Sequence, residues 1–378
     1  MDLETIIGLE IHVQLDTKTK MFSRDDNDAW GAGPNTRVNP VSMGFPGMLP
    51  VINKVAVEKG VAAAAALGCK IEPFSKFDRK NYFYPDLPTG YQISQFDQPI
   101  SSNGIVEMLH NGERMKIGIT RLHLENDAGK LTHTANGTLC DYNRAGTPLA
   151  EIVTDPDLRS PEEAQSLAKE VQRIVRFVGA SKADMEKGMM RFDASISLRP
   201  RGEDKLYPRT EIKNLNSFVA LLKALKYEQK KQRKLWESGE PPMVDKTVGW
   251  LDDKEETQLL REKESAMDYR YFPEPDLPPI TFTDKEIAEF EAQVPELPLA
   301  KYERYQSEWG ISEENALKLT EEKILADMLE GAVDEGGDPK KASNIILSVV
   351  IAEDDWRRSN LTPEHIADVL KLIEKGEV

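Results

Sequence analysis

Cysteine is scarce in this chain, which has two cysteines, Cys69 and Cys140, among 378 residues. Two isolated thiols supply neither a disulfide framework nor the four ligands of a closed zinc site, so both kinds of scaffold are excluded. Long apolar runs are also missing, because the longest one, Val61–Cys69, is far shorter than the roughly 20 residues of a membrane span. The first residues lack the basic region of a signal peptide. We therefore expect a cytoplasmic protein with no membrane association.

Glycine-rich phosphate loops are absent as well. The sequence contains no GxxxxGK[ST] motif and no GxGxxG motif after a strand-like segment, and Gly31-Ala32-Gly33 lies in a polar stretch. A P-loop or Rossmann nucleotide site is therefore not expected.

Negative charge is concentrated toward the C-terminus. The formal net charge of −16 divides into +1 for residues 1–250, −8 for residues 251–294 and −9 for residues 295–378. Nucleic-acid binding depends on local basic surface rather than on the total charge, so this composition excludes no partner.

Alternating apolar and polar residues predict several half-buried strands. The clearest are Ile7–Leu15, Ile117–Glu125 and Met189–Arg199, with shorter candidates at Leu149–Val153 and Arg209–Lys213. Helices interrupt the strands, and the pattern has no regular βαβ repeat. We predict an α+β fold with a largely antiparallel sheet.

Helix signals are strongest after Ser160, where a capping box and Pro161 precede apolar residues at helical spacing. Two further helices are predicted at Lys54–Leu67 and Ser217–Trp236. The proline-rich stretch 271–279 cannot be a central strand or a helix interior, so we interpret it as a rigid connector. Beyond Pro295 the pattern is helical, which predicts a domain of residues 1–294 followed by a small all-α domain of residues 295–378.

Carboxylates recur on the polar faces of the five predicted strands: Glu10, Glu125, Glu151, Asp193 and Glu211, with His12 beside the first. Carboxylates gathered on one sheet face would repel each other without a cation, and Mg²⁺ prefers oxygen ligands and bound phosphates. Arg121, Arg191 and Lys213 share these faces, as a phosphate-bearing substrate would require. For any single strand, an ordinary solvated face is the simpler interpretation. The repetition of acid with base on five strands favours a magnesium site.

Two other segments are rich in cations, one together with aromatic residues and one as a run of basic residues. The loop 78–88 contains Arg79, Lys80, Tyr82 and Tyr84 and suits stacking and phosphate contact, although it could equally pack its tyrosines into the core. The segment 223–234 is a basic helix, which is usually a solvated face but could contact phosphates.

Long segments of the chain resemble the B subunit of the glutamyl-tRNA(Gln)/aspartyl-tRNA(Asn) amidotransferases. The resemblance is carried, in family order, by GLEIHVQL (8–15), NYFYPDLP (81–88), GYQISQ (90–95), HLENDAGK (123–130), NRAG (143–146), RTEIKNLNSF (209–218) and DYRYFPEPDLPP (268–279). These motifs are ungapped and chemically unusual, and they span nearly the whole chain.

The resemblance implies a cradle-shaped catalytic domain over residues 1–294, followed by a helical domain and the start of a tail domain. It implies a ligase that uses ATP and Mg²⁺ to phosphorylate the side-chain carboxylate of Glu-tRNA(Gln) or Asp-tRNA(Asn), after which ammonia released from glutamine displaces the phosphate. The amidase, or A subunit, would deliver the ammonia, and the small C subunit would complete the heterotrimer. Misacylated tRNA is the expected substrate.

Site residues follow from the matching motifs. The catalytic candidates are Glu10, His12, Glu125 and Glu151, with Lys80 near the ammonia outlet. The first four are also metal ligands, with Asp193 and Glu211 as further metal candidates. The nucleotide- or phosphate-binding candidates are Arg79, Arg121, Lys130, Arg144, Arg191 and Lys213.

Several positions depart from the family pattern. Ser23, Asn39 and Ser42 stand where many relatives have zinc-binding cysteines, so we expect no zinc. Asn126 and Ser195 replace a usual Glu and a usual Asn, which predicts altered metal or nucleotide affinity. Relatives continue into a longer tail domain that helps to hold tRNA, so we expect weaker tRNA binding by this chain.

Two alternatives compete with this function. A non-catalytic scaffold or tRNA-binding subunit of the same complex would have no reason to keep the clustered charges of Glu10, His12, Glu125 and Glu151. An archaeal-type subunit would carry a large inserted domain, for which 378 residues leave no room. Which tRNA is served is not determined by the sequence.

Overall fold

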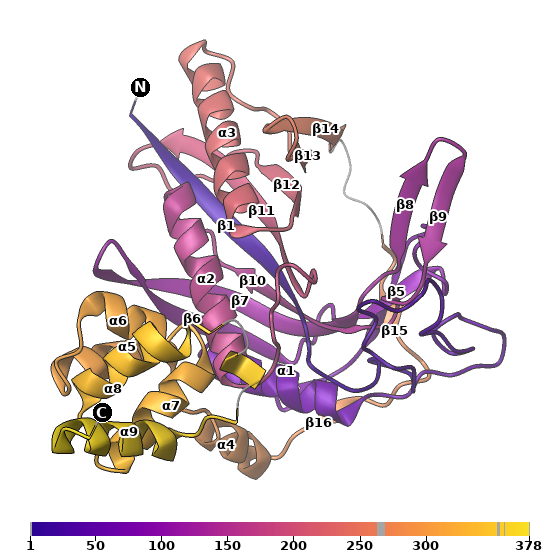
Figure 1. The fold of residues 1–378 in the computed structure, drawn as a ribbon. Helices are drawn as coiled ribbons and strands as arrows, with labels where there is room; N and C mark the ends of the chain where they lie inside the picture. Colours follow the sequence, from indigo (N-terminus) through magenta and orange to yellow (C-terminus); the bar gives the residue numbers. More distant parts are fainter. Residues whose placement is uncertain (1, 263–268, 354–355, 359, 378) are drawn as a thin grey trace. The chain divides into compact units, whose positions relative to one another are not determined.

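The computed structural model describes residues 2–262, 269–353, 356–358 and 360–377 (Figure 1). The chain divides into two compact units, Met1–Val294 and Pro295–Val378. Among the described residues, no helix combines the length and the apolar character that a membrane crossing requires.

A nine-stranded sheet forms the centre of the first unit. From edge to edge its strands are β14 (Glu256–Glu262), β13 (Lys246–Leu251), β12 (Thr210–Leu215), β11 (Met190–Pro200), β1 (Leu3–Gln14), β10 (Pro148–Thr154), β7 (Glu113–Asn126), β6 (Ser101–His110) and β2 (Lys70–Ile71). Every pair is antiparallel except β12–β13. The prediction of an α+β fold with a mainly antiparallel sheet is confirmed.

Within the described residues, three small sheets accompany the large one. Their strands are β15 (Phe272–Pro273), β4 (Asp78–Asn81) and β5 (Tyr91–Ser94), then β16 (Ile280–Thr281) with β3 (Phe74–Ser75), and the hairpin β8 (Lys130–Thr134) with β9 (Gly137–Asp141). The hairpin stands away from the main sheet (Figure 1). The proline-rich stretch supplies β15, which is an edge strand. Pro273 has a neighbouring strand on one side only, so its missing N–H group does not break the pairing of the sheet.

Three helices cover the apolar face of the large sheet: α1 (Lys54–Ala66), α2 (Pro161–Phe177) and α3 (Phe218–Glu237). Ser160 caps α2 by accepting a hydrogen bond from Glu163 N, as the capping box predicted. The helix α1 packs so closely that a Cβ on Gly60 would lie 2.5 Å from Leu124 Cδ2. The unit also contains α4 (Asp284–Ala292).

The strand faces follow the predicted alternation. On β1, Leu9, Ile11 and Val13 are at most 1% exposed and face the helices, so Glu10 and His12 face the other side. Two strands begin four residues earlier than predicted: β7 begins at Glu113 rather than at Ile117, and β1 begins at Leu3 rather than at Ile7. Ile6 is apolar on the otherwise polar face, which interrupted the alternation there.

The second unit is helical in its described residues. Its elements are α5 (Pro298–Ser307), α6 (Glu313–Leu319), α7 (Lys323–Asp334), α8 (Pro339–Ile345), the π-helix Ile346–Val350, the 3₁₀ turn Trp356–Arg358 and α9 (Pro363–Lys375). Tyr305 is fully buried and donates its hydroxyl hydrogen to Glu330 Oε1 at 2.9 Å. The role of this unit stays a prediction.

Candidate functional site

Strand register places the predicted acidic residues beside one another on the polar face of the sheet. His12 on β1 is paired with Glu151 on β10, and Glu151 is paired with His123 on β7. On the other side of β1, Glu10 is paired with Asp193 on β11. Directly paired residues of antiparallel strands project from the same face, so residues far apart in sequence converge at the middle of the sheet.

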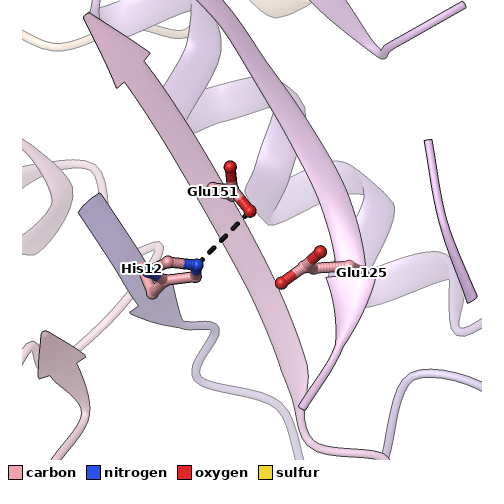
Figure 2. A group of neighbouring side chains, drawn as sticks. All are labelled: His12, Glu125 and Glu151. Atoms are coloured by element: carbon pink, nitrogen blue, oxygen red, sulfur yellow. Dashed lines mark ion pairs between the residues drawn. The ribbon is translucent and has the colours of Figure 1, made fainter. Parts of the chain in front are cut away.

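The first cluster consists of His12, Glu125 and Glu151. One ligand atom from each residue lies within 4.8 Å of the other two, and His12 Nε2 is 3.3 Å from Glu151 Oε2. Figure 2 shows the three side chains pointing toward one another from β1, β7 and β10. Glu125 is 3% exposed and Glu151 is 9% exposed. The imidazole and carboxylate groups therefore meet in a nearly buried space.

The second cluster consists of Glu10, Asp193 and Glu211, whose ligand atoms also lie within 4.8 Å of one another. Lys213 Nζ lies 2.7 Å from Asp193 Oδ2 and 2.8 Å from Glu211 Oε1. The sequence predicted one collection of acids, whereas the structure divides it into two clusters on neighbouring strands. Glu10 belongs to the second cluster rather than to the first.

Electrostatics differ between the two clusters. Burial raises the pKa of Glu10, and repulsion from Glu151 and Asp193 raises it further, against the attraction of Lys213. The pKa of Glu151 is well below its usual range, because His123 and His12 outweigh the effect of burial. Glu10 therefore binds a proton more readily than an ordinary glutamate, and Glu151 binds one less readily. The influence of Glu151 on Glu10 also shows that the clusters adjoin each other.

Lys80 lies beside the first cluster. Burial opposes its charge, but attraction by Glu125 and Glu151 raises the pKa of Lys80 above its usual value. Its ammonium nitrogen lies 5.1 Å from the centre of the Tyr269 ring and 6.0 Å from that of Tyr82, within the range of a cation–π contact. The charge of this lysine is thus stabilised both by aromatic rings and by the carboxylates.

Comparison with known proteins gives this geometry a family. Residues 5–288 match the family model described as the GatB/GatE catalytic domain. The chain belongs to this family.

The similar curated relatives are named as the B subunit of aspartyl/glutamyl-tRNA(Asn/Gln) amidotransferase. The chain is 49% identical to that of Geobacillus kaustophilus (strain HTA426) over 384 residues, which cover 100% of this chain and 80% of the relative. It is 48% identical over 385 residues to that of Oceanobacillus iheyensis, with the same shares covered. The Synechococcus sp. (strain JA-3-3Ab) relative is 45% identical over 391 residues, which cover 100% of this chain and 79% of the relative.

The six predicted phosphate-binding cations occupy different surroundings. Lys213 lies against the second cluster, and Arg121 Nε lies 3.3 Å from His123 Nδ1 beside the first. Arg191 is paired in register with His12 but forms its hydrogen bonds with Asp127.

In the described part of the chain, the other three cations form no hydrogen bond or ion pair with either cluster. Arg79 forms two hydrogen bonds with Glu274, at 2.6 and 2.9 Å, and Arg144 donates to the carbonyl oxygens of Ala128 and Gly129. Lys130 is exposed at the start of the β8–β9 hairpin. Their phosphate-binding roles stay predictions, and for Arg79 and Arg144 the contacts also support local structure.

The basic helix proposed for phosphate contact is α3, and several of its lysines have acidic partners within the chain. Lys226 Nζ is 2.7 Å from Glu162, Lys231 Nζ is 2.9 Å from Glu228, and Lys223 pairs with Glu255. These ion pairs reduce the local positive potential, which favours the solvated-face interpretation of this helix.

Two buried residues of the site were not assigned a role from the sequence. His123 is 4% exposed and Asp127 is 2% exposed. Both continue the alternation of Glu125, with His123 on β7 and Asp127 one residue after its end, so the period-two pattern contained the signal. Their importance depends on partners from other strands, which the pattern does not identify.

The residues that depart from the family pattern have clear structural surroundings. Asn126 Oδ1 accepts a hydrogen bond from Ile93 N at 2.8 Å, so this side chain supports β5. Asn39 N donates to Ser42 Oγ at 3.0 Å. In the same loop, Lys20 is fully buried with its Nζ 3.4 Å from Asp25 Oδ2. Hydrogen bonds and a buried ion pair hold this loop.

Proposed function

We propose that this chain is the subunit of a tRNA-dependent amidotransferase that activates and amidates the side-chain carboxylate of Glu-tRNA(Gln), Asp-tRNA(Asn) or both. The observation that carries the proposal is the pair of adjoining carboxylate clusters on one sheet face, flanked by Lys80, Lys213 and Arg121. Membership of the GatB/GatE family supports the reaction class, because similar relatives bear the amidotransferase name.

The first cluster suits a divalent cation. Glu125 and Glu151 supply the oxygen ligands that Mg²⁺ prefers. His12 Nδ1 is buried with no hydrogen-bond partner in the described part of the chain, and Nε2 already faces Glu151, so the imidazole can offer a nitrogen ligand beside that carboxylate. Glu10, Asp193 and Glu211 would hold a second ion if Lys213 released them. A bound Mg²⁺ would neutralise phosphate charge and align the phosphates for transfer.

ATP is the proposed phosphoryl donor. A cavity of about 160 Å³ adjoins Glu10 and is lined largely by apolar groups, including Ile6, Val153, Leu206 and Tyr207. Gly8 and Ser195 lie in its wall. An apolar cavity beside a metal-binding cluster suits a nucleoside whose phosphates extend toward the cluster. Ser195, which departs from the family pattern, would then influence nucleotide affinity.

The proposed reaction has two steps. The substrate carboxylate attacks the γ-phosphorus of ATP, the bond to ADP breaks, and an acyl phosphate forms on the aminoacyl-tRNA. Ammonia then attacks the acyl carbon, inorganic phosphate leaves, and the nitrogen loses a proton to give the amide. Lys80 lies near Glu125 and would hold a positive charge beside the departing phosphate. Its charge would also disfavour the entry of ammonium, so ammonia would react in its neutral form.

Glutamine hydrolysis is assigned to a separate amidase subunit. Burial raises the pKa of the Cys69 thiol to about 11, so this cysteine is almost wholly protonated at neutral pH and is a poor nucleophile. Cys140 lies on the β8–β9 hairpin. We propose that the amidase (A) subunit releases the ammonia and that the small C subunit assembles with both in a heterotrimer.

The decisive experiment reconstitutes the chain with an amidase and a small subunit and supplies ATP, Mg²⁺, glutamine and misacylated tRNA. We expect Gln-tRNA(Gln) or Asn-tRNA(Asn) to form. Glu125→Gln should lower the rate at least about 100-fold by removing a charged ligand. Glu113→Gln is the matched control, since Glu113 is an exposed acid on the same strand. Full activity of Glu125→Gln would contradict the catalytic assignment and favour the non-catalytic scaffold.

A further inference from the structure

His123 lies beside both carboxylates of the first cluster. Its Nε2 atom is 3.4 Å from Glu151 Oε2 and 3.6 Å from Glu125 Oε2. The side chain is nearly inaccessible to solvent, so little water competes with the carboxylates for its N–H group. Ser94 contributes a hydroxyl hydrogen to Glu125 Oε2 at 3.1 Å. Glu125 is thus contacted by two groups outside the cluster, one from β7 and one from β5.

Arg121 determines how the imidazole ring is used. Its Nε lies 3.3 Å from His123 Nδ1 in hydrogen-bond geometry. An arginine side chain has donors and no acceptor, so Nδ1 must accept and the ring hydrogen of the neutral imidazole must be on Nε2. In the protonated ring both nitrogens carry a hydrogen, so Nδ1 no longer accepts from Arg121, but Nε2 still donates. In both protonation states, therefore, an N–H group faces Glu125 and Glu151.

We propose that His123 is a positioning residue, which fixes the orientation of Glu125 and Glu151 for a divalent cation, and that Arg121 selects the tautomer of its neutral ring. This inference rests on the proposed function, because it assumes that the first cluster binds such an ion. Groups that hydrogen-bond to metal ligands fix the ligand geometry, and their loss commonly lowers metal affinity 10- to 100-fold. The predicted phosphate contact of Arg121 stays a prediction, and the contact with His123 supports an additional role for this residue.

The alternative is that His123 merely fills space between β7 and the neighbouring strands. The two roles make different predictions for substitutions of similar shape. Glutamine offers an N–H donor about where His123 Nε2 lies, whereas methionine has nearly the same length and no donor. A positioning role requires the donor. A space-filling role does not distinguish the two side chains.

The experiment measures the binding of Mn²⁺ alone to the purified full chain, by electron paramagnetic resonance of the free ion. An Asp193→Asn background removes one carboxylate of the second cluster, so the measurement reports on the first. We expect His123→Met to lower the Mn²⁺ affinity about 10- to 100-fold relative to the Asp193→Asn parent chain. The Mn²⁺ affinity of His123→Gln should stay within a few-fold of that of the same parent. His133→Met is the matched control, because His133 is exposed on the β8–β9 hairpin.

Each outcome is decisive. If the parent chain binds no Mn²⁺, the metal-binding part of the proposed function fails together with this inference. If the parent binds Mn²⁺ but His123→Gln and His123→Met have equal affinities, only the inference is overturned. Circular dichroism checks that each variant folds. If His123→Met does not fold, the same comparison is made between Arg121→Gln, which keeps a donor toward Nδ1, and Arg121→Met, which we expect to bind the ion more weakly.

Discussion

Arg191 and Asp127 form a bidentate ion pair between β11 and the end of β7. Arg191 Nη1 is 3.0 Å from Asp127 Oδ2, and Nη2 is 2.7 Å from Oδ1. Although burial opposes ionisation of Asp127, Arg191 and Arg144 lower its pKa below the usual range. Arg191 is directly paired with His12 in the sheet. The pair therefore joins the segment just after Glu125 to the residue that is paired with His12.

Removal of one partner of this pair should destabilise the fold. Arg191→Met leaves the Asp127 carboxylate nearly buried and without its bidentate partner, which typically costs about 3 to 5 kcal/mol for a buried pair. The measurement is the free energy of unfolding in urea. Arg201→Met is the control, because Arg201 forms an exposed pair with Asp2. Equal losses in the two variants would show that the Arg191–Asp127 pair has no special structural weight.

Lys20 and Asp25 should behave as a coupled pair. Their side chains are 0% and 1% exposed. Burial lowers the pKa of Lys20, but Asp25 opposes this effect. Lys20→Met and Asp25→Leu should each lower the free energy of unfolding by about 3 to 5 kcal/mol, because each leaves one buried charge unpaired. The double variant should lose much less than the sum. Additive losses would exclude the coupling.

Gly60 should tolerate no side chain beside an intact Leu124. A Cβ at residue 60 would lie 2.5 Å from Leu124 Cδ2, and Leu124 is fully buried. Gly60→Ala should therefore destabilise the protein by about 1 to 3 kcal/mol through overpacking. In the Gly60→Ala background, Leu124→Ala should therefore lower the free energy of unfolding by less than it does in the parent chain. Thermal unfolding of the two single variants and the double variant tests this coupling.

The period-two pattern could predict which side chains share a face, since each strand alternates between the helices and the polar side. It could not predict the strand order β11–β1–β10–β7, which pairs His12 with Glu151 and Glu10 with Asp193. That order is set by packing between segments distant in sequence. For the same reason, the sequence predicted neither the division into two clusters nor the pairing of Arg79 with Glu274, 195 residues away.

Replacement of Glu10 by glutamine should stabilise the protein when no divalent ion is present. Burial, Glu151 and Asp193 raise the pKa of Glu10 in the folded state above its value in the unfolded chain. The folded state therefore binds the proton more tightly, so stability falls as the pH rises from the unfolded-state pKa through the folded-state pKa. Glu10→Gln removes this loss, and the variant should have the higher free energy of unfolding at pH 7 in EDTA.

The pH dependence provides the check on this prediction. The advantage of Glu10→Gln should disappear below about pH 4, where Glu10 is protonated in both the folded and the unfolded state. Added Mn²⁺ should also reduce the stability advantage of Glu10→Gln. The ion binds the folded protein and not the unfolded chain, and there it compensates the charges of the clustered carboxylates. An advantage that is the same at pH 4 and pH 7 would show that repulsion is not its cause.

The last prediction concerns the order in which the two clusters bind ions. Lys213 Nζ already lies within 2.8 Å of two carboxylates of the second cluster, Asp193 and Glu211. A divalent ion must displace or outcompete this ammonium group. In the described part of the chain, Glu125 and Glu151 instead pair with the imidazoles of His12 and His123, which can lose their protons, and Lys80 acts on them as a neighbouring charge rather than as an ion-pair partner. The first cluster should therefore bind Mn²⁺ more tightly, and Glu125→Gln should remove the tighter of two binding phases. Lys213→Met should strengthen the weaker phase, because it leaves the carboxylates without their internal cation.

Titration of Mn²⁺ into the full chain and into both variants separates the phases. A weaker second phase in Lys213→Met than in the parent chain would show that Lys213 supports ion binding rather than competing with it.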